Sequence, residues 1–197
     1  FVENIAKFMS FLEEIGLKSK LEIKLENTIV EKEEAKDESH PLFGKRIVMT
    51  KVRDKYIIEQ VEKVGGIMED TFGKKTDILI NVLPLTESTT NILRKQELQR
   101  LPRGAFIINM GRGGIVNEAD LLSLLDEGHI TAAAMDVFEE EPLPANNPLW
   151  SHPSVYITPH IAGQSNPKSS AKTIANNIRR IEDGKMPFPI YNITKGY

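Results

Sequence analysis

The stretch from Ala105 to Val137, AFIINMGRGGIVNEADLLSLLDEGHITAAAMDV, contains a strand, a helix and a second strand in that order. Short apolar runs stand at both ends, as in strands that are buried on both faces of a sheet. Between them, Asn117 occupies the N-cap position of an apolar periodic segment that Gly128 ends. Strands that are joined through a helix pair in parallel, so this stretch predicts a βαβ unit.

The same alternation extends on both sides of this unit. It predicts an α/β fold with a doubly wound, Rossmann-like parallel sheet. The predicted strands are 45–50, 67–70, 77–83, 105–110, 131–137 and 154–158, and the predicted helices are 54–64, 90–100, 117–127 and 167–183.

The first 39 residues have a different pattern. Residues 1–17 carry apolar side chains at helical spacing, and residues 21–30 begin with the alternation of a half-exposed strand. The charged stretch EKEEAKDESHP, residues 31–41, has no apolar periodicity and is typical of a solvated linker. We therefore expect an N-terminal extension over residues 1–39 and a Rossmann-like domain over residues 40–197.

The composition excludes several classes of function. The 197 residues include no cysteine, which rules out disulfides, thiolate metal sites and thiol nucleophiles, and no metal site is predicted. A net charge of −3 gives no reason to expect membrane or strong nucleic-acid binding. No apolar run is long enough to span a bilayer and no secretory signal is visible, so a cytoplasmic setting is expected. A homo-oligomer is compatible with this composition.

Four polar residues follow predicted strands directly. Arg112 follows strand 105–110, Asp136 and Glu141 stand at or after the end of the next strand, and His160 follows the last one. Ligands of open α/β sheets bind outside the carboxyl ends of the strands. An arginine can hold a carboxylate through two hydrogen bonds, and a histidine can exchange a proton with an oxygen. A carboxylate beside a histidine orients the ring and favours its charged form.

Four segments resemble the nucleotide-binding half of the D-2-hydroxyacid dehydrogenases, over residues 77–197. They are DILINVLPLTESTTNIL (77–93), the stretch from Leu101 to Pro144, NPLWSHPSVYITPHIAG (147–163) and the final KGY (195–197). The pattern most resembles the glyoxylate/hydroxypyruvate reductase branch. This resemblance implies NAD or NADP as cofactor and a small 2-oxo acid as substrate. It implies that Arg112 binds the substrate carboxylate and carbonyl, that His160 is the general acid/base and that Glu141 is its partner.

The resemblance also implies a cofactor surface, in which Asp136 contacts the nicotinamide amide. The other residues of this surface are Leu83, Pro84, Thr89, Asn109, Met110, Gly111, Ala162 and Gly163.

The first strand–helix turn, in GKRIVMTKVRDKYIIEQVEKVGG (44–66), lacks the glycines of a dinucleotide-binding loop. Side chains at those positions keep the backbone away from a pyrophosphate. Thr50, Lys51 and Arg53 are the candidates for contact with the phosphates, and Asp70 is the candidate for the ribose. We therefore expect weak cofactor binding.

Residues 1–80 resemble instead the BRCT region of NAD-dependent DNA ligases, through the entry at Gly44–Lys45, Thr50, the pair Gly65–Gly66 and KKTDILI. Both families possess TDILI (76–80) as a strand, which suggests a chimera joined there. The neighbour order of the two parent sheets implies six strands in the order 2-1-3-4-5-6.

Three functions are compatible with this pattern. The first is a remnant of an NAD(P)-dependent 2-hydroxyacid dehydrogenase with weak or absent activity. The second is a BRCT-like module that uses Thr50 and Lys75 to bind a phosphopeptide or a DNA end. The third is an engineered chimera without activity.

Overall fold

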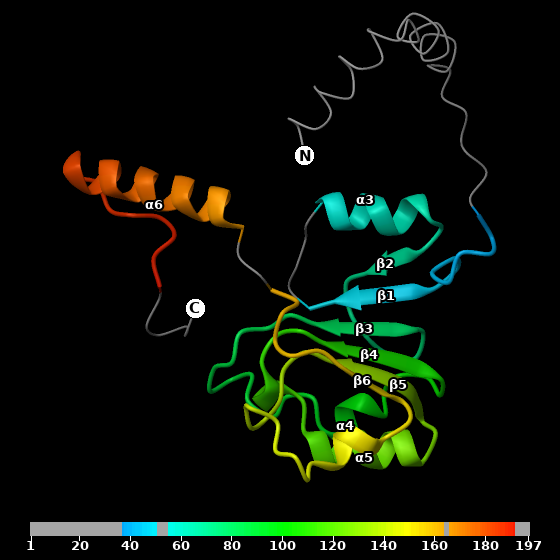
Figure 1. The fold of residues 1–197 in the computed structure, drawn as a ribbon. Helices are drawn as coiled ribbons and strands as arrows, with labels where there is room; N and C mark the ends of the chain where they lie inside the picture. Colours follow the sequence, from blue (N-terminus) through cyan, green and yellow to red (C-terminus); the bar gives the residue numbers. More distant parts are fainter. Residues whose placement is uncertain (1–36, 51–54, 164–165, 192–197) are drawn as a thin grey trace, which may run out of the picture. The chain divides into compact units, whose positions relative to one another are not determined.

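The computed structural model describes residues 37–50, 55–163 and 166–191 (Figure 1). The predicted helix and strand of residues 1–30 and most of the charged linker lie outside the described residues, as do Lys51 and Arg53. Within them, strands and helices alternate from residue 46 to residue 182, except that the second and third strands follow each other without a helix. The boundary predicted at residue 39 stays a prediction.

One parallel sheet of six strands is the centre of the fold, and its order is β2-β1-β3-β4-β5-β6. The prediction of a doubly wound sheet in the order 2-1-3-4-5-6 is confirmed. The strands are β1 (Arg46–Met49), β2 (Ile67–Glu69), β3 (Ile78–Asn81), β4 (Ala105–Asn109), β5 (Ile130–Met135) and β6 (Val155–Ile157).

The order of the strands reverses between β1 and β3. The chain passes from β1 outward to β2, and then returns to the other side of β1 to form β3. In doubly wound sheets this reversal opens a crevice at the carboxyl ends of the two strands, where ligands bind. Thr50 and Asn81 stand at that point.

Four α-helices connect or follow the described strands: α3 (Lys55–Lys63), α4 (Lys95–Leu98), α5 (Glu118–Asp126) and α6 (Pro167–Glu182). Figure 1 shows α3 on one side of the sheet and α4 with α5 on the other. Helix α5 begins as predicted, because the Asn117 side chain accepts a hydrogen bond from the Asp120 N–H at 2.9 Å. The described helices include none that is long and apolar enough to cross a bilayer.

Helix α4 is shorter than the predicted helix 90–100. Leu93 forms a parallel bridge with Val116 instead, and its N–H donates to the Ile115 carbonyl at 3.0 Å. Asn91, two residues before Leu93, has a φ of 51°, which is outside the helical region. Pairing with a distant segment therefore overrides the local helical spacing.

The core lies between the sheet and α5. Leu121 and Leu124 of α5 and Ile107 of β4 have no exposed surface. Burying one such side chain contributes about 1.5–3 kcal/mol. This core fixes the carboxyl ends of β4 and β5, from which the candidate site extends.

Candidate active site

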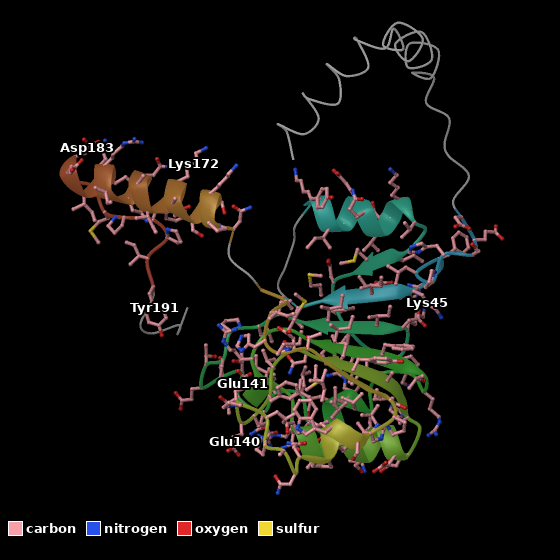
Figure 2. The ribbon with its side chains drawn as sticks, in the orientation of Figure 1. Lys45, Glu140, Glu141, Lys172, Asp183 and Tyr191 are labelled. Atoms are coloured by element: carbon pink, nitrogen blue, oxygen red, sulfur yellow. The ribbon has the colours of Figure 1, made fainter. Side chains whose placement is uncertain are left out.

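The candidate catalytic residues lie on loops at one edge of the sheet. Figure 2 shows Glu141 at the end where the strands finish, whereas Lys45 stands at the opposite end, just before β1. Arg112 follows β4, Asp136 follows β5 and His160 follows β6. The structure thus brings to one edge the residues that the sequence placed after separate strands.

Glu141 and His160 form a hydrogen-bonded pair. The Nδ1 atom of His160 lies 2.7 Å from Oε2 of Glu141, and the Phe138 N–H donates to Oε1 at 2.9 Å. The His160 side chain is 45% exposed and the Glu141 side chain is 35% exposed. Because Nδ1 is engaged with the carboxylate, Nε2 is the ring atom that can exchange a proton with a ligand. This arrangement orients the imidazole for acid/base chemistry.

The Glu141 carboxyl is held in its charged form. Burial raises its pKa, but this effect is outweighed by the hydrogen bonds from His160 and the Phe138 N–H and by the charges of His160 and Arg112. The net result is a pKa below the ordinary value of 4.5. Near neutral pH, Glu141 is therefore a carboxylate that stabilises a positive charge on the neighbouring ring.

Asp136 anchors the loop that carries His160. Its carboxylate accepts hydrogen bonds from the Thr158 hydroxyl at 2.5 Å and from the Ile161 and Ala162 N–H groups at 2.9 Å each. These bonds hold a loop in which His160 has a φ of 53°, a left-handed conformation that costs a non-glycine residue about 1–3 kcal/mol. The contact of Asp136 with a nicotinamide amide stays a prediction.

The loop that carries Glu141 is anchored by two other acids. The Glu118 N–H donates to the Glu139 carboxylate at 2.8 Å, and the Glu139 N–H donates to the Glu118 carboxylate at 2.7 Å. Asn147 also donates to Glu118, at 3.2 Å, and Glu118 is only 9% exposed. Sequence reasoning missed this pair, and its only signal was an acid in the first turn of a helix.

Gly113 allows this loop to lie against the turn that precedes α5. A Cβ atom at this position would lie 1.8 Å from the Phe138 carbonyl oxygen, so only glycine fits there. Because Phe138 donates to Glu141 and Glu118 binds Glu139, the backbone on both sides of the acid is fixed.

Arg112 borders a hollow at the same edge of the sheet. The volume of this hollow is about 420 Å³, and its lining comes from residues 82–85 after β3 and 110–112 after β4. The Arg112 guanidinium donates to the Gly111 carbonyl at 2.7 Å, and its charge helps to lower the pKa of Glu141. The predicted cofactor residues Leu83, Pro84, Met110 and Gly111 all line this hollow.

The ends of β1, β3 and β4 share a polar network. The Thr50 hydroxyl donates to Asn81 at 3.3 Å and accepts from the Val82 N–H at 2.9 Å, and Asn81 donates to Asn109 at 2.8 Å. Among the described residues, the Nδ2 atom of Asn109 is a buried side-chain donor without a hydrogen-bond partner. Asn109 directly precedes Met110, which lines the Arg112 hollow, but the Asn109 side chain itself is fully buried.

The remaining predicted cofactor residues are placed as follows. The Thr89 hydroxyl donates to the Pro84 carbonyl at 2.7 Å and thereby stabilises the turn after β3. Ala162 donates to Asp136, and a Cβ atom at Gly163 would meet nothing within 4 Å. Asp70 is exposed and directly follows Glu69, the last residue of β2, so it lies at the expected edge.

Comparison with known proteins decides the family. Residues 39–162 match the sequence profile of the NAD-binding domain of the D-isomer-specific 2-hydroxyacid dehydrogenases. The chain belongs to this family.

The chain is 42% identical over 134 residues to glyoxylate/hydroxypyruvate reductase A of Salmonella paratyphi B, a match that covers 68% of this chain and 43% of that protein. It therefore spans less than half the length of this curated relative of the dehydrogenase family.

Two solved dehydrogenase structures have a similar fold. The D-isomer-specific 2-hydroxyacid dehydrogenase of Xanthobacter autotrophicus Py2, in complex with NADPH and MES, is 31% identical with a TM-score of 0.74, and the match covers 80% of this chain and 75% of that one. The NADPH-dependent glyoxylate/hydroxypyruvate reductase of Sinorhizobium meliloti, in complex with NADP and sulfate, is 25% identical with a TM-score of 0.72, over 98% of this chain and 70% of that one.

The dehydrogenase match also includes residues 39–80 of the segment that resembles a BRCT region. The predicted phosphate site lacks a geometric basis, because Thr50 follows β1 whereas Lys75 precedes β3. The next acid after Lys75, Asp77, accepts a hydrogen bond from the Arg46 N–H at the start of β1. Thr50 and Lys75 therefore stand at opposite ends of the parallel strands, and the matches described above support neither a BRCT function nor a chimera.

Proposed function

We propose that this chain provides the cofactor-binding half and the acid/base residues of an NAD(P)-dependent reductase of small 2-oxo acids, such as glyoxylate or hydroxypyruvate. The observation that supports this most directly is the pair of Glu141 and His160 at 2.7 Å, beside an arginine at the same edge of the sheet. The curated relative described above has this activity in its name.

Each residue has a defined task in this reaction. Arg112 binds the carboxylate of the 2-oxo acid, and Nε2 of His160 gives a proton to the carbonyl oxygen. Glu141 stabilises the imidazolium before transfer and fixes the ring during it. A reduced nicotinamide, when bound, supplies the hydride. We place the nicotinamide end in the hollow beside Arg112.

The first strand–helix segment determines how tightly the cofactor binds in this proposal. The first turn lacks the glycines that admit a pyrophosphate, so we expect weaker binding of NADH and NADPH than in a relative that has them. Titration calorimetry with both cofactors measures this. Tight binding would show that side chains in this turn replace the glycines effectively.

Kinetics on variants test the chemistry. We expect His160→Ala to lower reductase turnover about a hundred- to ten-thousand-fold, the usual effect of losing a positioned acid/base. His152→Ala is the matched control, since His152 also pairs with a carboxylate, Asp126 at 3.4 Å, but precedes β6 at the other end of the strands.

Glu141→Gln should move the activity profile to lower pH, because it removes the carboxylate that faces Nδ1 of His160. Full activity of His160→Ala, with His152→Ala also unchanged, would show that this histidine does not carry the reaction. Absence of turnover by the wild-type chain at saturating cofactor would favour an inactive domain.

A further inference from the structure

An apolar pocket adjoins the acid/base pair on the side formed by β6. Its volume is about 720 Å³, larger than that of the hollow beside Arg112. Glu141 and His160 line it, and they are its only charged or titratable residues. The other lining residues are Phe138, Pro142, Leu143, Trp150, Ile157 and Pro159.

The walls of this pocket are anchored to the fold. Phe138 is only 7% exposed and belongs to the hydrophobic core, and Leu143 and Ile157 pack against that core. Trp150 is 54% exposed, yet its indole N–H donates to the Pro144 carbonyl at 3.0 Å. The apolar surface is therefore held in position beside the acid/base pair by the core and by a hydrogen bond.

We propose that this pocket takes the apolar side chain of a 2-oxo acid, so that branched aliphatic substrates such as 4-methyl-2-oxopentanoate are preferred over glyoxylate. This proposal rests on the proposed function, because it assigns the carbonyl to His160 and the carboxylate to Arg112. The pocket then binds the side chain of the substrate.

Charge favours an apolar occupant over a polar one. The Glu141 carboxylate is ionised and faces the pocket, so a second acidic group would be repelled. A polar tail would lose water without gaining a partner, since Glu141 and His160 are already bonded to each other. Each methylene that leaves water contributes roughly a fourfold gain in binding.

Binding to the wild-type chain can be read without turnover. Trp150 is the only tryptophan of the sequence, so its fluorescence reports directly on the pocket. We expect 4-methylpentanoate to change this fluorescence and to bind on the order of tenfold or more tighter than acetate, which has the same carboxylate but no tail.

Variants identify the surface that binds the tail. Leu143→Gln should remove most of the difference between the two carboxylic acids. Trp150→Ala should do the same by calorimetry, which covers the case in which the glutamine variant does not fold. Tyr156→Gln is the control, because Tyr156 is 66% exposed and adjoins Ile157 on the opposite face of β6. It should leave the difference unchanged.

The two proposals fail in distinguishable ways. If 4-methylpentanoate binds no tighter than acetate while glyoxylate is reduced, the side-chain pocket is refuted and the reductase stands. If the tailed acid binds tighter and Leu143→Gln abolishes this, but no 2-oxo acid is reduced, the pocket stands and the reductase fails. Equal kcat/KM for glyoxylate and 4-methyl-2-oxopentanoate in an active chain would also overturn the proposal.

Discussion

Replacing Asp136 with asparagine tests how much its carboxylate contributes to holding the loop that carries His160. The side chain keeps its shape, and one oxygen can still accept hydrogen bonds from Thr158 and from the Ile161 N–H. The other oxygen becomes an NH₂ group that faces the Ala162 N–H, so two donors meet where a charge-assisted bond existed. The change therefore removes one bond and the negative charge without opening a cavity.

The cost follows from the burial of this site. Asp136 is only 4% exposed, so water cannot readily replace the lost acceptor. A hydrogen bond to a charged group contributes about 1.5–3 kcal/mol net, and an unpaired donor adds its desolvation cost. We expect Asp136→Asn to lower the free energy of unfolding by about 2–3 kcal/mol. Asp126→Asn, at a side chain that is 74% exposed, should cost less than about 1 kcal/mol.

The pH dependence of this difference has a definite sign. Burial raises the pKa of Asp136, but the bonds from Thr158 and from the two N–H groups, with the charge of His160, outweigh it and keep the pKa below the ordinary 3.8. A carboxyl whose folded pKa is depressed contributes stability above its unfolded pKa and loses it as the pH falls through the folded one. The gap between wild type and variant should be complete near neutral pH and shrink below pH 3.8.

Urea denaturation at several pH values measures this gap, and amide hydrogen exchange at Ile161 and Ala162 reports on the loop itself. Protection of these two amides should fall in Asp136→Asn and remain in Asp126→Asn. A loss of less than about 0.5 kcal/mol, or a gap that grows as the pH falls, would refute the assignment of Asp136 as the loop anchor.

Two further changes test the anchor of the Glu141 loop. Glu118→Ala removes the acceptor of the Glu139 N–H, so it should lower the free energy of unfolding by about 1–3 kcal/mol and also lower reductase activity. Asp120→Ala, which loses a hydrogen bond at the same end of α5, should lower stability alone. Equal activity losses in the two variants would contradict the assignment of Glu118 as an anchor. Gly113→Ala places a Cβ atom 1.8 Å from the Phe138 oxygen, so it should lower the free energy of unfolding, measured by thermal denaturation, by about 1–3 kcal/mol and should abolish activity. An unchanged melting temperature would show that the loop can move aside.

The sheet could be predicted from the sequence because each strand is a short apolar run bounded by a turn signal. Parallel strands also place all their carboxyl ends at one edge, which is why Arg112, Glu141 and His160 could be assigned to one site. The order of the strands across the sheet could be predicted only from the resemblance to known families, since apolar patterns carry no information on which strands are neighbours.

What failed or was missed depends on contacts between distant segments. The helix predicted at 90–100 was shortened because Leu93 pairs with Val116, a contact that local periodicity cannot indicate. The reciprocal bonds of Glu118 and Glu139 were invisible for the same reason, because they form only when the loop after β5 returns to the start of α5. Phosphate contacts by Lys51 and Arg53 stay predictions.

The acid/base part of the proposed site is held by hydrogen bonds on both of its loops. Asp136 fixes the His160 loop, Glu118 fixes the Glu141 loop, and both anchors come from residues between β4 and the end of the 158–162 loop. Separate groups of hydrogen bonds therefore hold the two loops whose side chains meet in the acid/base pair. The sequence after Thr50, where we predict the phosphate contacts, has no glycines to admit a pyrophosphate. If turnover is weak, the physical cause to examine first is the occupancy of the cofactor site, since the proton-transferring pair is already in place.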